Sequence, residues 1–201
     1  MGRTSDAKER LINTAVVLIR ARSYTSVSVD DICKNAGVRK GSFYHFFPSK
    51  RDLALAAVDS WWESMQVDVL EPAFQTDIPP LERIQRMFDR AVTLHSKAQE
   101  NTGQFQGCPL GNLALEVSSQ DEVMRVKLDQ TFHQFSAFFE KALNEGVTDG
   151  SIPPNLNVQG TAQALLSYFY GIIMMAKTAN DAGVMKDLSS RALQLVSAPL
   201  A

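Results

Sequence analysis

The sequence predicts an all-α protein, and three observations support this prediction. Apolar residues recur at spacings of three and four over long segments, as on the buried side of an amphipathic helix. Ser, Asp or Asn precedes several of these segments, and Gly or Pro follows them, as at helix ends. The chain shows neither the strict alternation of a half-buried strand nor an internal repeat.

The bulk composition is that of a soluble globular protein. The 201 residues are 45% hydrophobic and 21% charged, and no apolar run approaches the roughly 20 residues of a membrane span. The first residues lead directly into a charged amphipathic segment, which is not the pattern of a signal peptide. The only two cysteines suit a reducing compartment. We therefore expect a cytoplasmic protein without membrane association.

Charge is distributed unevenly along the chain. The first 52 residues carry ten Lys or Arg and five Asp or Glu, a net charge of +5, whereas the remainder has a net charge of −7. A basic head on an acidic body is typical of a nucleic-acid-binding segment joined to a domain that avoids phosphate.

The head is predicted to contain three helices. The first covers about residues 6–22, with an apolar stripe that includes Leu11 and Ala15. Ser28 is the predicted N-cap of the second helix, which ends at Gly37. A third helix begins almost at once, at residues 38–39. Two short helices joined by a tight turn containing Gly predict a helix-turn-helix unit.

The third helix combines cations, hydroxyls and aromatic rings in a way that suits contact with DNA. Its cations can neutralise phosphates, its hydroxyls can hydrogen-bond phosphate oxygens, and Gly41 allows close approach. Arg39, Lys40, Ser42 and His45 are the candidates for reading bases. The complete predicted DNA-binding set is Ser28, Arg39, Lys40, Gly41, Ser42, Tyr44, His45 and Lys50. A unit this small is expected to bind a palindromic double-stranded operator as a dimer.

Six further helices are expected in the body. Ser49 is the predicted cap of the first, Ser119 of the fourth and Asn157 of the fifth. The six helices cover about 50–70, 81–99, 109–117, 119–144, 158–179 and 184–197.

Cys108 lies at the predicted start of a helix. Pro109 occupies the first helical position, which places Cys108 at the N-cap, facing the positive end of the helix dipole. Such a position favours a reactive thiolate, and Gly107 with the polar loop before it is expected to allow access. Lys177 is a candidate to assist the thiolate. Cys33, by contrast, is predicted to be a small packing residue.

A body of apolar helices can also enclose a ligand without covalent chemistry. The candidate residues for such a pocket are Trp61, Trp62, Phe105, Phe132 and Tyr168. Aromatic stripes at helical spacing more often form core than pocket. Covalent sensing at Cys108 and binding of a small apolar or aromatic effector therefore both remain open from the residues.

Residues 28–53, SVDDICKNAGVRKGSFYHFFPSKRDL, resemble the N-terminal signature of TetR-type transcriptional regulators. The resemblance implies a nine-helix homodimer with a DNA-binding domain at 1–48 and an effector-sensing and dimerisation domain at 49–201. It implies dimerisation through the last two helices, about 158–179 and 184–197, and repression as the usual activity. The chain departs from the family pattern at Ser23, Val27 and Cys33, where Gly, Thr and Ala are common.

Residues 107–119, GCPLGNLALEVSS, together with Met124 and Arg125, also resemble the NemR-type branch of this family. That branch contains repressors that respond to electrophiles and oxidants through a cysteine at this position. The resemblance therefore implies release of DNA after modification of Cys108.

Two other classes of function fit the sequence poorly. An enzyme that uses Cys108 would need His95 or His133 as a base, and both are predicted on helix surfaces. The sequence has no phosphate-binding loop and no cluster of metal ligands, so we expect no catalysis, cofactor or metal. A helical module that binds only proteins would not require the basic head, and its binding to nucleic acid would be absent or independent of salt.

Overall fold

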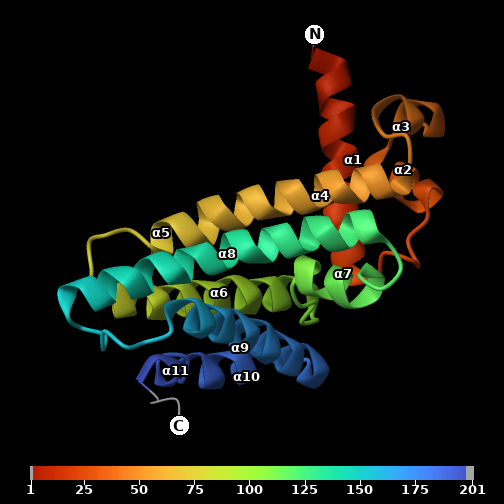
Figure 1. Ribbon diagram of the computed structural model, residues 1–201. Coiled ribbons are helices and arrows are strands. Elements are labelled where there is room, and N and C mark those ends of the chain that lie inside the picture. The colour runs from red at the N-terminus through yellow and green to blue at the C-terminus, as the bar shows by residue number, and fades with distance from the viewer. Residues whose placement is uncertain (1, 198–201) are drawn as a thin grey trace. The chain divides into compact units, whose positions relative to one another are not determined.

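The computed structural model describes residues 2–197, which contain helices and no strand, so the all-α prediction is confirmed (Figure 1). Residue 1 and residues 198–201, which the predicted domains include, lie outside the described part. The helices are α1 (Gly2–Ala21), α2 (Val29–Ala36), α3 (Lys40–Phe46), α4 (Lys50–Met65), η1 (Gln66–Leu70), α5 (Glu71–Ala73), α6 (Pro80–Thr102), α7 (Pro109–Val117), α8 (Glu122–Asp149), α9 (Val158–Ala179), α10 (Ala182–Ser189) and α11 (Gln194–Ser197).

The nine predicted segments correspond to these helices, but several boundaries and one cap need correction. The helix expected at 119–144 continues to Asp149. The helix expected at 50–70 continues to Ala73 through the π-helical η1 and α5. The expected final helix is broken between α10 and α11, where the chain makes turns. The cap of α8 is Asp121 rather than Ser119, because the Met124 N–H donates to Asp121 Oδ1 at 3.0 Å. A carboxylate at this position also complements the helix dipole.

The chain divides into two compact units that do not follow sequence order. Unit 1 contains the chain up to Ser64 together with Cys108–Gln130, and unit 2 contains Met65–Gly107 and the residues from Thr131 onward. Unit 1 therefore holds α4, α7 and the start of α8 in addition to the three helices of the predicted head.

In unit 1, α1, α2 and α3 pack against one another around a small apolar core. Its fully buried side chains include Leu11, Ile32, Phe43 and Leu53. Ser28 caps α2 as predicted: the Asp31 N–H donates to Ser28 Oγ at 3.0 Å, and the Ser28 N–H donates back to the Asp31 carboxylate at 3.0 Å. Helix α2 ends at Gly37 with φ +62°, a left-handed conformation that favours glycine.

In unit 2, α10 packs on both α6 and α9, and rings from α6, α8 and α9 form an aromatic core. The Phe135 ring lies 5.7 Å from that of Phe139 and 5.3 Å from that of Phe169, and the Phe88 ring lies 5.7 Å from that of Phe169. All four side chains are at most 1% exposed. Asn157 caps α9 as predicted, by accepting the Gly160 N–H at 3.0 Å.

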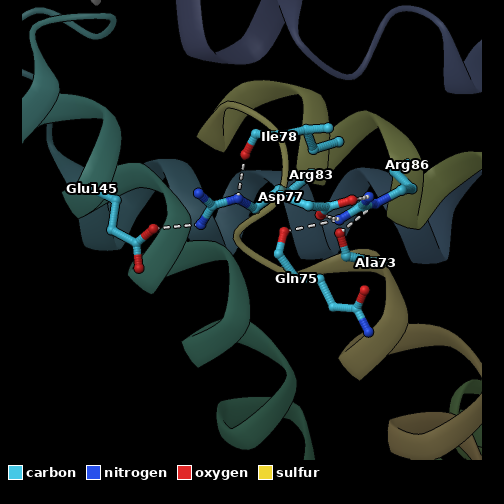
Figure 2. A network of polar contacts seen from close by, with 7 residues as sticks. All are labelled: Ala73, Gln75, Asp77, Ile78, Arg83, Arg86 and Glu145. Atoms are coloured by element: carbon cyan, nitrogen blue, oxygen red, sulfur yellow. Dashed lines mark hydrogen bonds and ion pairs between the residues drawn. The ribbon is translucent and has the colours of Figure 1, made fainter.

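Two arginines of α6 hold the loop that precedes this helix (Figure 2). Arg83 Nε donates to the Ile78 carbonyl at 2.7 Å, and Arg83 Nη1 forms an ion pair with Glu145 of α8. Arg86 donates to the carbonyls of Ala73 and Gln75 and forms a bidentate pair with Asp77. The loop carbonyls, which accept no hydrogen bond within a helix, thus accept hydrogen bonds from charged guanidinium groups.

Candidate functional site

The predicted recognition helix, α3, is held to the head by one side and exposed on the other. Phe43 is 0% exposed and Phe47 is 4% exposed, and their ring centroids lie 6.0 Å apart. The predicted DNA-contacting residues Arg39, Lys40, Gly41, Ser42, Tyr44 and His45 are all exposed. A Cβ added to Gly41 would meet no atom within 4 Å, so the packing of the protein itself does not require glycine there.

Lys40 of α3 and Ser28, the cap of α2, both have charged partners inside the head. Lys40 Nζ lies 2.8 Å from the Asp30 carboxylate, and the Ser28 hydroxyl donates to Asp31 Oδ2 at 2.6 Å. The hydrogen bond with Asp30 raises the pKa of Lys40, so this side chain is a cation at neutral pH. If Lys40 or Ser28 contacts a DNA phosphate, the phosphate would replace the exposed partner Asp30 or Asp31. This phosphate contact stays a prediction.

Lys50 has a role that the sequence did not reveal. Its ammonium donates to the carbonyls of Tyr24 at 2.8 Å and Val27 at 2.9 Å, and it lies 4.2 Å from the centroid of the Tyr24 ring. Burial lowers the pKa of Lys50. Lys50 therefore holds residues 22–28, here called the α1–α2 loop, while its predicted contact with phosphate stays a prediction.

Glu116, in the last turn of α7, binds the same loop from another side. Its carboxylate accepts the N–H groups of Tyr24 at 2.8 Å and Thr25 at 2.7 Å, and also the Thr25 hydroxyl at 2.5 Å. Burial acts to raise the pKa of Glu116, but the hydrogen bonds from Thr25 and Tyr24 outweigh it, so the net shift is downward. Sequence reasoning missed Glu116, because nothing in its local pattern points to a loop 91 residues away.

Cys108 is the N-cap of α7, as predicted, and Pro109 follows it in the first turn. The predicted access is wrong: Cys108 is 3% exposed, and Gly107, which was expected to leave it open, is itself buried. A cation lies nearby within unit 1. Burial lowers the pKa of Arg20, in the last turn of α1, while the negative charge of a Cys108 thiolate acts in the opposite direction. Neither cysteine is in a disulfide.

The aromatic residues predicted for an effector pocket are distributed over both units. Trp61 lines an apolar cavity of about 20 Å³ in unit 1, together with Val16, Ile19, Pro109 and Leu110. That volume suits roughly one water molecule and is too small for an organic ligand. Trp62, also in unit 1, is buried.

The other three aromatic candidates lie in unit 2, and each packs against a neighbour there. Phe105 stacks on His95 with centroids 5.1 Å apart, Phe132 meets the Tyr170 ring at 5.0 Å, and the Tyr168 hydroxyl donates to the Leu188 carbonyl at 2.8 Å.

The side chains considered for acid–base roles differ in how far they are exposed. His95 was expected on a helix surface, but it is 8% exposed, because α6 turns that face toward Phe105. His133 is exposed, as expected. Lys177 is an exposed residue of α9 in unit 2, and burial of its ammonium lowers its pKa. Its assistance to Cys108 stays a prediction.

No cluster of three or more His, Cys, Asp or Glu side chains in residues 2–197 is arranged to hold a metal ion. Within the same range, no helix has both the length and the apolar character needed to cross a bilayer.

Comparison with known proteins gives matches over most of the chain. A family model described as "Bacterial regulatory proteins, tetR family" matches residues 11–57, and one described as "Tetracyclin repressor-like, C-terminal domain" matches residues 80–191. The HTH-type transcriptional repressor DhaR from Mycobacterium sp. (strain GP1) is 29% identical over 177 residues, which cover 88% of this chain and 85% of DhaR.

Two further relatives extend the likeness to almost the whole chain. The HTH-type transcriptional repressor NemR from Escherichia coli (strain K12) is 24% identical over 96% of each protein, and the crystal structure of reduced E. coli NemR matches with a TM-score of 0.84 over 98% of this chain and 100% of that one. The crystal structure of regulatory protein TetR from Rhodobacter sphaeroides has a TM-score of 0.84 and 25% identity over 94% of this chain and 98% of its own. These relatives are regulators, not enzymes.

Proposed function

Since this chain belongs to the TetR family of bacterial regulatory proteins, we propose that it is a homodimeric cytoplasmic repressor that leaves a palindromic operator when Cys108 is modified. Members of this family share the function of a DNA-binding regulator. The identity of the sensor, the dimer interface and the individual DNA contacts are proposed from the residues. The observation that carries the proposal is a buried thiol at the N-cap of α7, in the same compact unit as the recognition helix.

The exposed side of α3 supports the assignment of the DNA contacts. Arg39 and Lys40 would pair with phosphates or guanine, and Ser42 and Tyr44 would hydrogen-bond phosphate oxygens. Gly41 would let the backbone approach the duplex, since no side chain of the protein itself occupies that space. His45 would lie at the base edges or the backbone. Ser28 would contribute at the rim after exchanging its internal partner. Lys50 would contribute there without leaving the α1–α2 loop, because an ammonium has three N–H donors and the Tyr24 and Val27 carbonyls take two of them.

The surroundings of Cys108 support both its reactivity and its effect. The positive end of the α7 dipole and the nearby Arg20 guanidinium favour the thiolate, whereas burial opposes it. A thiolate that attacks an α,β-unsaturated carbonyl forms an S–C bond, and the displaced electron pair takes a proton from water at the α-carbon. A peroxide would instead oxidise it, with formation of an S–O bond and loss of hydroxide.

Burial explains why modification would change the structure. Cys108 is 3% exposed, so an adduct of several atoms has no room in place. Reaction therefore requires α7 to move, and the adduct then holds it in the displaced position. For release, the modified state must bind DNA less tightly than the unmodified one.

The last helices are the proposed dimer interface. Helix α9 exposes the adjacent side chains of Met174 and Met175 with 54% and 53% of their surface accessible, so the pair offers an apolar surface that a partner helix would cover. Gly171 lies on α9 with nothing within 4 Å of an added Cβ, so a second helix can approach closely there. Helices α9 and α10 would pair with their copies in a partner subunit, with α11 beside them, and the two heads would read the two half-sites.

The test is operator binding with and without a thiol reagent. The DNA is a duplex that the wild-type protein itself selects from a random pool, and the reagents are N-ethylmaleimide and hydrogen peroxide in separate arms. Wild type and the matched control Cys33→Ala should both release DNA, whereas Cys108→Ser should hold it. Light scattering on the complex should give two protein chains for each palindrome.

Two outcomes would contradict the proposal. If Cys108→Ser releases DNA as wild type does, the thiol of Cys108 is not the sensor. If mass spectrometry shows an adduct on Cys108 while the protein stays bound to DNA, covalent sensing fails, and a non-covalent effector for the aromatic body becomes the leading hypothesis.

A further inference from the structure

The α1–α2 loop is held by two oppositely charged side chains that divide its backbone groups between them. The Glu116 carboxylate takes the N–H groups of Tyr24 and Thr25, and the Lys50 ammonium takes the carbonyls of Tyr24 and Val27. Both contacts are charge-assisted hydrogen bonds, which are stronger than neutral ones. The negative charge of Glu116 also acts to raise the pKa of Lys50, against the effect of burial.

The loop that these groups hold leads directly into the DNA-binding helices. Only two residues separate Thr25 from Ser28, the N-cap of α2, and Val27 between them is 1% exposed. The backbone at Tyr24 and Thr25 therefore controls where α2 begins relative to the end of α1. Since α3 packs on α1 and α2, the loop also controls the position of the recognition helix.

Glu116 connects this loop to the proposed sensor. It lies in the last turn of α7, and Cys108 lies at the N-cap of the same helix. Nine helical residues at 1.5 Å per residue place the two ends about 13 Å apart. A short helix moves as a unit, so displacement of α7 at Cys108 would withdraw the Glu116 carboxylate and leave two N–H groups without an acceptor.

Ion pairs within the same unit anchor the surroundings of Glu116. Arg51 of α4 lies 3.5 Å from Asp121, and Asp59 of α4 pairs with Lys127 of α8. The start of α8, which follows α7 directly, is thus fixed to α4, whose first turn supplies Lys50. The loop, α4 and α7 form one polar network within unit 1.

We propose that Glu116 is a positioning residue for operator binding, and that it holds the recognition helix in the DNA-binding position through the α1–α2 loop. This inference rests on the proposed DNA-binding function, but not on the identity of the effector. Withdrawal of Glu116 is then the step by which movement of α7 reaches the DNA.

The test compares Glu116→Ala and Glu116→Gln with the matched control Glu122→Gln, an exposed carboxylate on α8 that pairs with its helical neighbour Arg125. Glu116→Ala should weaken operator binding roughly tenfold or more, because the recognition helix is no longer fixed. Glu116→Gln retains one acceptor oxygen and should lose less. Amide hydrogen exchange should accelerate within residues 22–28, with little change in unit 2.

Salt dependence separates positioning from direct contact. Glu116 touches no phosphate, so the slope of log affinity against log salt should stay that of wild type in Glu116→Ala. Arg39→Ala, which removes a proposed phosphate contact, should reduce the magnitude of that slope by about one. If Glu116→Ala does not fold, Thr25→Val removes only the hydroxyl contact and should produce a smaller loss in the same direction.

Unchanged operator affinity and unchanged loop exchange in the Glu116 variants would overturn the inference. These measurements use no electrophile, so failure of Cys108 as the sensor would leave them unaffected. If wild type binds no selected duplex at all, the proposed function fails first, and that result is distinct from a selective loss in Glu116→Ala.

Discussion

The α1–α2 loop of unit 1 and the aromatic core of unit 2 are held by opposite kinds of interaction. The loop depends on charged groups at its surface, namely Glu116 and Lys50, which contact backbone atoms. The core depends on rings such as Phe135 and Phe169, which are at most 1% exposed. Polar contacts near water exchange partners at small net cost, whereas packed rings resist any change of volume. A switch is therefore better placed in the loop, and a scaffold in the core.

Among these variants, Phe135→Ala should have the largest effect, because it removes a ring from the aromatic core of unit 2. The ring is 0% exposed and contacts Phe139 and Phe169, so its removal leaves a cavity. We expect a loss of about 3–5 kcal/mol in the free energy of unfolding, measured by urea denaturation. The control Leu115→Ala removes a side chain that is 83% exposed and should change stability by less than about 0.5 kcal/mol. Equal losses in the two variants would contradict the picture of a packed core.

Local features of both units were predictable from sequence, because caps and breaks depend on adjacent residues. The caps at Ser28, Cys108 and Asn157 were found in this way. The cap of α8 was misplaced because Ser119 and Asp121 are both good capping residues, and only the folded backbone selects between them. The spacing of residues in the sequence cannot distinguish between these two caps.

Features that join distant segments were not predictable. The burial of Cys108 and His95 depends on which helix covers each of them, and a helical pattern does not identify its partner. The contact of Glu116 with the α1–α2 loop crosses 91 residues. A single glutamate in a short helix resembles any solvated surface residue, so this part of the candidate site required the structure.

A smaller effect is expected from the one ion pair in Figure 2 that includes a buried cation. Arg83 is 7% exposed, and Glu145→Gln would leave its guanidinium with a weaker partner. The free energy of unfolding should fall by about 2 kcal/mol, since a buried charge then lacks full compensation. Operator affinity measured at a temperature where the variant is folded should stay that of wild type, because the pair belongs to the scaffold unit.

The control for this pair is Glu122→Gln, which breaks the exposed pair with Arg125 and should cause no measurable change. If Glu145→Gln weakens operator binding while it leaves stability intact, the division of roles between the two units is wrong.

The smallest effect should be seen in the pH dependence of the loop contact. The net downward shift in the pKa of Glu116 means that the folded protein binds its proton less tightly than the unfolded chain does. The carboxylate therefore contributes stability that is fully present above the unfolded pKa of about 4.3, and that is lost as the pH falls through the lower folded value.

Unfolding of wild type and Glu116→Gln should be compared between about pH 3 and pH 7, on either side of that unfolded pKa. The difference in stability should be constant above about pH 5 and should shrink as the solution is acidified. Other acids with lowered pKa, such as Asp31 and Asp77, titrate in both proteins and cancel in the difference. A difference that stays constant to the acid limit would mean that Glu116 holds the loop without its charge, and the contrast between a charged loop and an apolar core would then lose its physical basis.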